Sequence, residues 1–104
     1  MKIDPTSAFR ADLTKDGKVL AFDSPRCGLT VFRAQGGSLR VQEFYSRTWV
    51  NASDVRFVKG SDVLGPMGPD LIAVDVAKVE KFQHDHAGAH AYALAEIDDG
   101  ALAP

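Results

Sequence analysis

The order of apolar and polar residues in the first half of the chain predicts a β-hairpin at its start. Two runs of extended character, residues 9–14 and 18–23, flank Lys15-Asp16-Gly17. An Asp-Gly pair between two such runs is typical of a hairpin with a tight turn. Residues 19–22 are continuously apolar, which predicts a strand that is buried on both faces.

A helix and a third strand are predicted to follow this hairpin. Ser24 and Pro25 have the residue types preferred at the N-cap and at the first helical position. The Gly36-Gly37 pair ends the helical pattern, because glycine readily terminates a helix. Residues 39–45 then alternate between apolar and polar, as in a strand with one buried face.

The second half of the chain repeats this order. Residues 71–75 match the apolar strand and the following aspartate of residues 19–23. Residues 76–86 are predicted to form a helix, in which Val79 and Phe82 share one apolar face. Asp23 and Asp75 both precede a predicted helix, and helix capping is the simpler explanation of both carboxylates.

These patterns predict an α+β fold in which two similar ββαβ units pack together. We expect one small domain over residues 1–104, with about 1–45 as its first half and about 46–104 as its second. Neither half could bury the face of its sheet alone, so the two must share a core.

Composition and charge exclude two classes of function. The chain has 104 residues and a formal net charge of -2, without a cluster of basic residues, which argues against a nucleic-acid partner. No apolar run approaches the ~20 residues that span a bilayer. The single cysteine excludes an internal disulfide.

The least regular stretch, residues 59–70, contains the best candidate for chemistry. Three glycines and two prolines make a turn-rich loop, and Met67 lies between Pro66 and Gly68. One interpretation is that Met67 fills a gap beneath the loop, since methionine adapts to irregular spaces. The other is that its thioether is held at the surface as a soft ligand, which would select Cu(I) over harder ions.

The segment around this methionine resembles the signature of the NosL family of nitrous oxide reductase accessory proteins. The resemblance rests on Trp49, Lys59-Gly60-Ser61 and the run Gly65-Pro66-Met67-Gly68-Pro69-Asp70, followed by Phe82, His86 and Gly88. It implies a fold of two ββαβ units, in agreement with the repeat. It also implies that Met67 is a copper ligand.

The resemblance implies a function as well. Members of this family are periplasmic, usually lipid-anchored Cu(I) chaperones that help to assemble the copper-sulfide centre of nitrous oxide reductase. We therefore expect Cu(I) as the bound metal and an acceptor copper protein as the partner. The resemblance implies a periplasmic protein whose full-length form is an outer-membrane lipoprotein and contacts the membrane only through its N-terminal lipid.

The start of the chain departs from the family pattern. Many members carry a Cys-Gly-Met segment before the first strand, whereas this sequence opens with Met1-Lys2-Ile3. We expect Met1 to occupy the position of that methionine, in a truncated form of the protein, and to be a further metal ligand. The alternative is that Met1 is an ordinary initiator of a protein that is not exported.

Cys27 and His86 are the remaining candidate metal ligands. A thiolate binds Cu(I) strongly, and Cys27 falls in the first turn of a predicted helix, where negative charge is stabilised. Cys27 could equally be a small buried apolar residue. His86 is the best accessory ligand among His84, His86 and His90, although the helix dipole alone explains histidines in a last turn.

The sequence gives little support to an enzyme. It contains no Gly-rich phosphate loop, no Ser-His-Asp order and no Cys-x-x-Cys pair. Two alternatives to a metallochaperone remain open. One is an interaction module that uses the Gly-Pro-Met-Gly-Pro loop as a docking surface, and the other is a small enzyme with Cys27 as its nucleophile.

Overall fold

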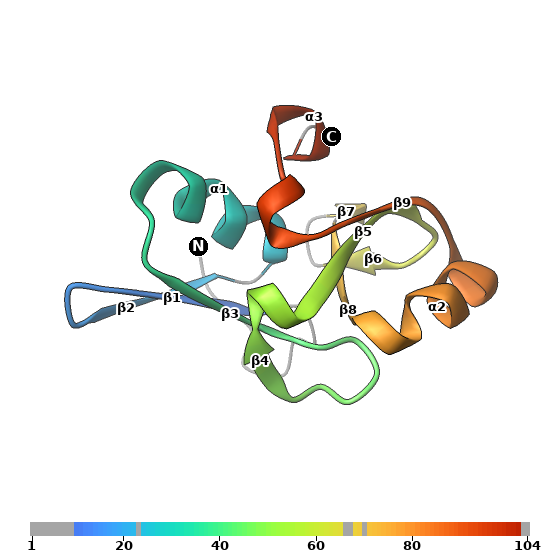
Figure 1. Cartoon of the computed structure of the whole chain (residues 1–104), viewed down its shortest axis with the longest axis horizontal. Coiled ribbons are helices and arrows are strands. Elements are labelled where there is room, and N and C mark those ends of the chain that lie inside the picture. The colour runs from blue at the N-terminus through green and yellow to red at the C-terminus, as the bar shows by residue number, and fades with distance from the viewer. Residues whose placement is uncertain (1–9, 23, 66–67, 70, 103–104) are drawn as a thin grey trace.

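The computed structural model describes residues 10–22, 24–65, 68–69 and 71–102. The strands are β1 (Ala11–Lys15), β2 (Lys18–Phe22), β3 (Ser38–Gln42), β4 (Trp49–Asn51), β5 (Val55–Ser61), β6 (Leu64–Gly65), β7 (Gly68–Pro69), β8 (Ile72–Asp75) and β9 (Ala87–Tyr92). The helices are α1 (Pro25–Gln35), α2 (Val79–His86) and α3 (Asp99–Leu102), with short 3-10 turns at η1 (Ala52–Asp54), η2 (Val76–Lys78) and η3 (Leu94–Glu96). Figure 1 shows α1 and α2 in separate parts of the molecule, each beside its own sheet.

The first sheet contains the predicted hairpin. Its strand order is β2-β1-β3-β4, and all neighbours are antiparallel. The turn between β1 and β2 is the pair Asp16 and Gly17, with φ values of 52° and 76°. Positive φ at both central residues is the geometry of a type I′ turn, which suits the twist of a hairpin. The prediction of this hairpin is confirmed.

Helix α1 begins and ends where the sequence predicts. Ser24 is the N-cap, and its Oγ accepts a hydrogen bond from the backbone N–H of Cys27 at 3.3 Å. Pro25 occupies the first turn. Gly36 follows the helix with φ of 74°, and its N–H donates to the carbonyl of Phe32. Serine, proline and glycine therefore act here as local start and stop signals.

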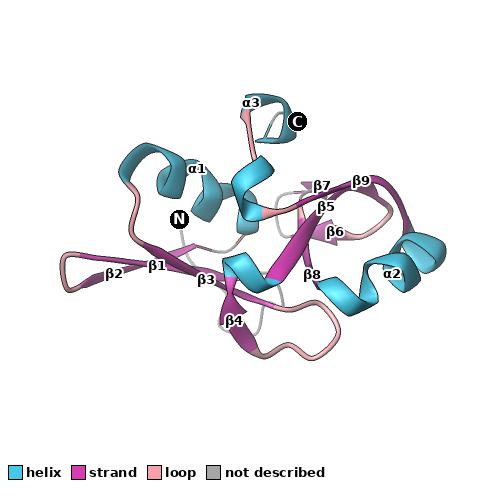
Figure 2. Cartoon of the chain, viewed as in Figure 1, coloured by secondary structure: helices cyan, strands magenta, loops and turns pink. Residues whose placement is uncertain are grey.

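The second sheet has the same topology as the first three strands of the first sheet. Its order is β8-β5-β9, which matches β2-β1-β3, and α2 takes the place of α1. The α+β fold with two similar strand-strand-helix-strand units is thus confirmed (Figure 2). The second unit differs by an insertion, because the two-stranded β6-β7 hairpin lies between its first and second strands.

The prediction that residues 19–22 are buried on both faces is wrong. β2 is an edge strand of its sheet, and Val19 and Leu20 are 61% and 44% exposed. In Figure 1 the turn end of the β1-β2 hairpin points away from the rest of the molecule, which leaves this end of β2 in solvent. The matching strand β8 does have the predicted burial, because Ile72, Ala73 and Val74 are all at most 2% exposed.

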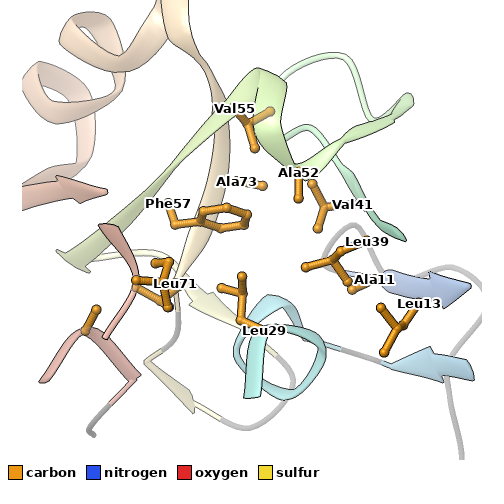
Figure 3. Packing of buried hydrophobic residues seen from close by; sticks show 12 residues of the cluster. Ala11, Leu13, Leu29, Leu39, Val41, Ala52, Val55, Phe57, Leu71 and Ala73 are labelled. Atoms are coloured by element: carbon orange, nitrogen blue, oxygen red, sulfur yellow. The ribbon is translucent and has the colours of Figure 1, made fainter. Parts of the chain in front are cut away.

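The two units share one core. Leu13, Leu29 and Val41 from the first unit pack in the same cluster as Phe57 and Leu71 from the second (Figure 3). A second cluster lies on the other face of the second sheet. It consists of Val58, Ile72, Val74 and Phe82, with Phe44, Tyr45, Val63, Val79 and Ala91 packed against it. The second sheet is therefore covered on both faces, by the first unit and by α2.

In the part of the chain that the structure describes, no helix is long and apolar enough to cross a membrane.

Candidate metal site

The β6-β7 hairpin frames the methionine that the sequence singles out. Leu64 pairs with Pro69, and Gly65 pairs with Gly68, in an antiparallel register. Met67 joins these strands in the sequence and lies outside the described residues, as does Met1. The described strands thus define the base of a short hairpin, which is the kind of element that carries binding residues on a fixed support.

The base of this hairpin is attached to the end of α2 by two hydrogen bonds. The backbone N–H of Asp62 donates to the carbonyl of His86 at 2.9 Å. The side chains of the same residues meet through Asp62 Oδ1 and His86 Nδ1 at 3.0 Å. Because the last carbonyls of a helix have no partner within the helix, the first of these bonds also completes the end of α2.

His86 is held between aromatic rings. Its imidazole lies 5.0 Å from the ring of Phe82 and 5.5 Å from that of Phe44, measured between centroids. The side chain is 32% exposed, so one part of the ring remains accessible. The structure therefore brings His86 to the base of the Met67 hairpin. His84 is exposed on α2, and His90 is exposed on β9 with its ring 6.1 Å from Tyr92.

Cys27 lies in the other unit. It is in the first turn of α1, is only partly buried, and is a free thiol. The sequence repeat aligns it with Val79 of α2, which is also partly buried. Cys27 is therefore not a fully buried residue. Within the described ranges, no three His, Cys, Asp or Glu side chains gather closely enough to hold a metal.

The sequence model of the NosL family matches residues 5–102. The chain belongs to the NosL family. Its fold is similar to that of the crystal structure of the copper chaperone NosL from Shewanella denitrificans, with a TM-score of 0.76 and 22% sequence identity. That match covers 88% of this chain and 79% of the other. No curated protein matches the chain in sequence.

Glu43 is a residue of this NosL-family chain that the sequence analysis missed. It follows β3, is 2% exposed, and accepts hydrogen bonds from the backbone N–H groups of Ser46 at 2.8 Å, Tyr45 at 3.0 Å and Asp75 at 3.1 Å. Burial raises the pKa of this carboxyl, but the hydrogen bonds from Ser46, Asp75 and Tyr45 outweigh it and leave the pKa below its ordinary value. Glu43 thereby fixes the turn that presses Phe44 against His86.

Tyr45 belongs to the same turn and extends the aromatic environment of His86. Its ring lies 5.0 Å from Phe44, and the ammonium groups of Lys81 and Lys78 lie 4.7 Å and 5.6 Å from its centroid. Burial raises the pKa of Tyr45, and the negative charges of Asp85 and Glu43 add to the effect. Phe44 therefore lies beside His86, and Tyr45 packs against Phe44 and Phe82, whereas Phe57 is in the shared core.

Sequence reasoning missed Glu43 and Asp62 for the same reason. Both are acidic residues within polar or turn-rich stretches, where a solvated carboxylate is the ordinary expectation. The repeat offers no equivalent of either contact. Only the fold brings Glu43 to β8, and Asp62 to the end of α2.

Proposed function

We propose that this chain binds Cu(I) and delivers it to an acceptor copper protein. The main support for the proposal is that the chain belongs to the NosL family. Further support comes from the similarity of its fold to the crystal structure of a copper chaperone. We further propose that the acceptor is nitrous oxide reductase, whose copper centre requires assembly, or a related copper protein. The proposal includes a periplasmic location and attachment to the membrane through an N-terminal lipid.

Met67 is the proposed principal ligand. Its thioether is a soft, uncharged donor, which favours Cu(I) over the harder and more abundant divalent cations. The short strands on either side support the loop that carries it. A thioether also binds Cu(I) without losing a proton, so copper can enter and leave without a proton-transfer step at this ligand.

His86, Cys27 and Met1 are proposed as further ligands. His86 is the one supported by local geometry, since Nδ1 faces Asp62 and the ring is restrained by Phe44 and Phe82. Cys27 offers a free thiol on a partly buried residue of α1. The proposed set is small and open, which suits a chaperone, because the acceptor must displace each ligand in turn by exchange.

Direct transfer tests this function. The chain, loaded anaerobically with one equivalent of Cu(I), is mixed with metal-free nitrous oxide reductase in the presence of a chromogenic Cu(I) chelator. We expect the acceptor to gain copper faster than from the chelator complex alone, because ligand exchange between two proteins avoids free copper. The control is the same mixture with a Met67→Leu chain.

The outcomes of this experiment distinguish a copper chaperone from a docking module that binds no metal. Copper that passes to the acceptor at the same rate with and without the chain would sink the chaperone proposal. A chain that binds the acceptor tightly but carries no Cu(I) would instead support the alternative of a docking module that uses the Gly-Pro-Met-Gly-Pro loop.

A further inference from the structure

The contact between Asp62 and His86 has a chemical consequence beyond the attachment of the hairpin. A carboxylate has acceptors only, so in a hydrogen bond with a neutral imidazole the ring nitrogen must be the donor. The 3.0 Å contact therefore places the proton of neutral His86 on Nδ1. The lone pair then resides on Nε2, and in this tautomer a neutral imidazole can bind a metal through Nε2.

We propose that Asp62 is a positioning residue that prepares His86 as a nitrogen ligand through Nε2. This inference rests on the proposed copper function. Metal-binding histidines usually donate their second ring N–H to a carboxylate or carbonyl, which fixes the tautomer and the orientation of the ring. Asp62 supplies this group, and it lies five positions before Met67 in the sequence.

The backbone makes the arrangement more rigid. The N–H of Asp62 bonds to the carbonyl of His86, so the two residues are joined at both main chain and side chain. Phe82 and Phe44 restrict the ring from its other sides. The same residue therefore orients the imidazole and anchors the strand that leads to the methionine. Such restraint favours binding because less freedom is lost when the metal arrives.

The arrangement is specific to His86. His84 precedes it by two positions on α2 and is exposed, and residues two apart on a helix do not share a face. His90 lies on β9, where it pairs with Lys59. Neither of these histidines has a hydrogen bond to a carboxylate in the described contacts. Asp62 thus selects one histidine of three.

The tautomer of His86 in the metal-free chain is the direct test. Nitrogen-15 spectra of the imidazole groups at pH 8 distinguish a protonated ring nitrogen from an unprotonated one, and a His86→Gln variant identifies the relevant signals. We expect Nδ1 to be protonated and Nε2 unprotonated. In Asp62→Ala the Nε2-protonated form should become substantially populated, whereas Asp62→Asn should retain part of the preference through its amide oxygen.

A matched control removes the same charge from a neighbouring place. Asp85 precedes His86 on α2 and is exposed, so Asp85→Ala should leave the tautomer unchanged. The side chain of Asp62 is itself 66% exposed, and its variants are expected to fold, which far-ultraviolet circular dichroism checks. The Cu(I) affinity of Asp62→Ala should fall by about tenfold or more, as for other partners of metal-binding histidines.

Failure of this inference is distinguishable from failure of the copper function. A tautomer that is the same in the unaltered chain and in Asp62→Ala would overturn the role of Asp62, whatever the copper affinity. An unaltered Cu(I) affinity in Asp62→Ala would overturn it as well. Absence of Cu(I) binding by the unaltered chain would overturn the proposed function and with it the ligand role of His86.

Discussion

Glu43 is the residue on which the turn beside His86 depends. Its carboxylate accepts three backbone hydrogen bonds while it is almost fully buried, and it links this turn to β8. An isosteric amide would keep the shape but offer one acceptor oxygen in place of two and lose the negative charge. The remaining donors would then lack a partner of equal strength.

We expect Glu43→Gln to lower the free energy of unfolding by about 1–3 kcal/mol at pH 7, the range for disturbing hydrogen bonds to a buried charged group. Urea denaturation measures this change. Glu80→Gln, at an exposed position of α2, is the control and should change stability by less than about 0.5 kcal/mol. Equal effects of the two substitutions would contradict the role of Glu43.

The effect of Glu43→Gln on stability is also expected to depend on pH. Because the pKa of Glu43 is lower in the folded chain than its ordinary value of 4.5, its contribution is present above that value and is lost as the pH falls through the folded pKa. The difference in stability between the unaltered chain and Glu43→Gln should therefore shrink on acidification below about pH 4.5. A difference that grows instead would show that the sign of the shift is wrong.

At the scale of elements, the sequence predicted those with strong local signals. Ser24, Pro25 and Gly36 marked the ends of α1, and Asp16-Gly17 marked the hairpin, because each acts through its own backbone geometry. The burial of a strand, in contrast, depends on which other elements cover it, so the strand's own sequence does not determine it. Both β2 and β8 are edge strands of their sheets. Their similar apolar runs differ in exposure because β2 lies in a projecting hairpin, whereas the two faces of β8 are covered by the shared core and by α2.

Helix α1 approaches its sheet closely at Gly28. A Cβ atom at this position would lie 2.9 Å from Cβ of Ala11 and 3.3 Å from Cδ1 of Leu39. Alanine normally stabilises a helix relative to glycine by about 1 kcal/mol. Here the crowding should reverse the sign, so Gly28→Ala should destabilise the chain by about 1–3 kcal/mol.

Thermal or urea unfolding checks this prediction, and the double variant provides the sharper test. Addition of Ala11→Gly removes the nearest atom and should recover part of the loss. The control variant Ala34→Gly, at an exposed position of the same helix, measures the effect of helix propensity without crowding. Stabilisation by Gly28→Ala would mean that α1 does not lie this close to β1.

At the scale of the whole molecule, the two units depend on each other. Leu29 of α1 packs in one cluster with Phe57 and Leu71 of the second unit, so neither unit has a complete core of its own. The repeated pattern of apolar residues was enough to predict both units and their packing. It could not predict the pairing of β6 with β7, because two-residue strands rich in glycine and proline carry no periodic signal.

The insertion that holds Met67 belongs to the second unit alone, and Cys27 belongs to the first. The repeat that predicted the fold therefore could not locate the proposed metal ligands, which do not follow the repeat. Met67 was proposed as a ligand from its unusual neighbours in the sequence and from the family resemblance. The contact of His86 with Asp62 emerged only from the fold, since the two residues are 24 positions apart.

The measurement that tests the copper function most directly is an anaerobic Cu(I) competition titration against a chromogenic chelator. It compares the unaltered chain with Met67→Ala and Met67→Leu, of which the second keeps the bulk of the side chain and removes only the sulfur. We predict at least tenfold weaker binding in both variants, a loss of about 1.4 kcal/mol. An affinity for Cu(I) that Met67→Leu leaves unchanged, or no binding by the unaltered chain, would contradict Met67 as the ligand on which the proposed function depends.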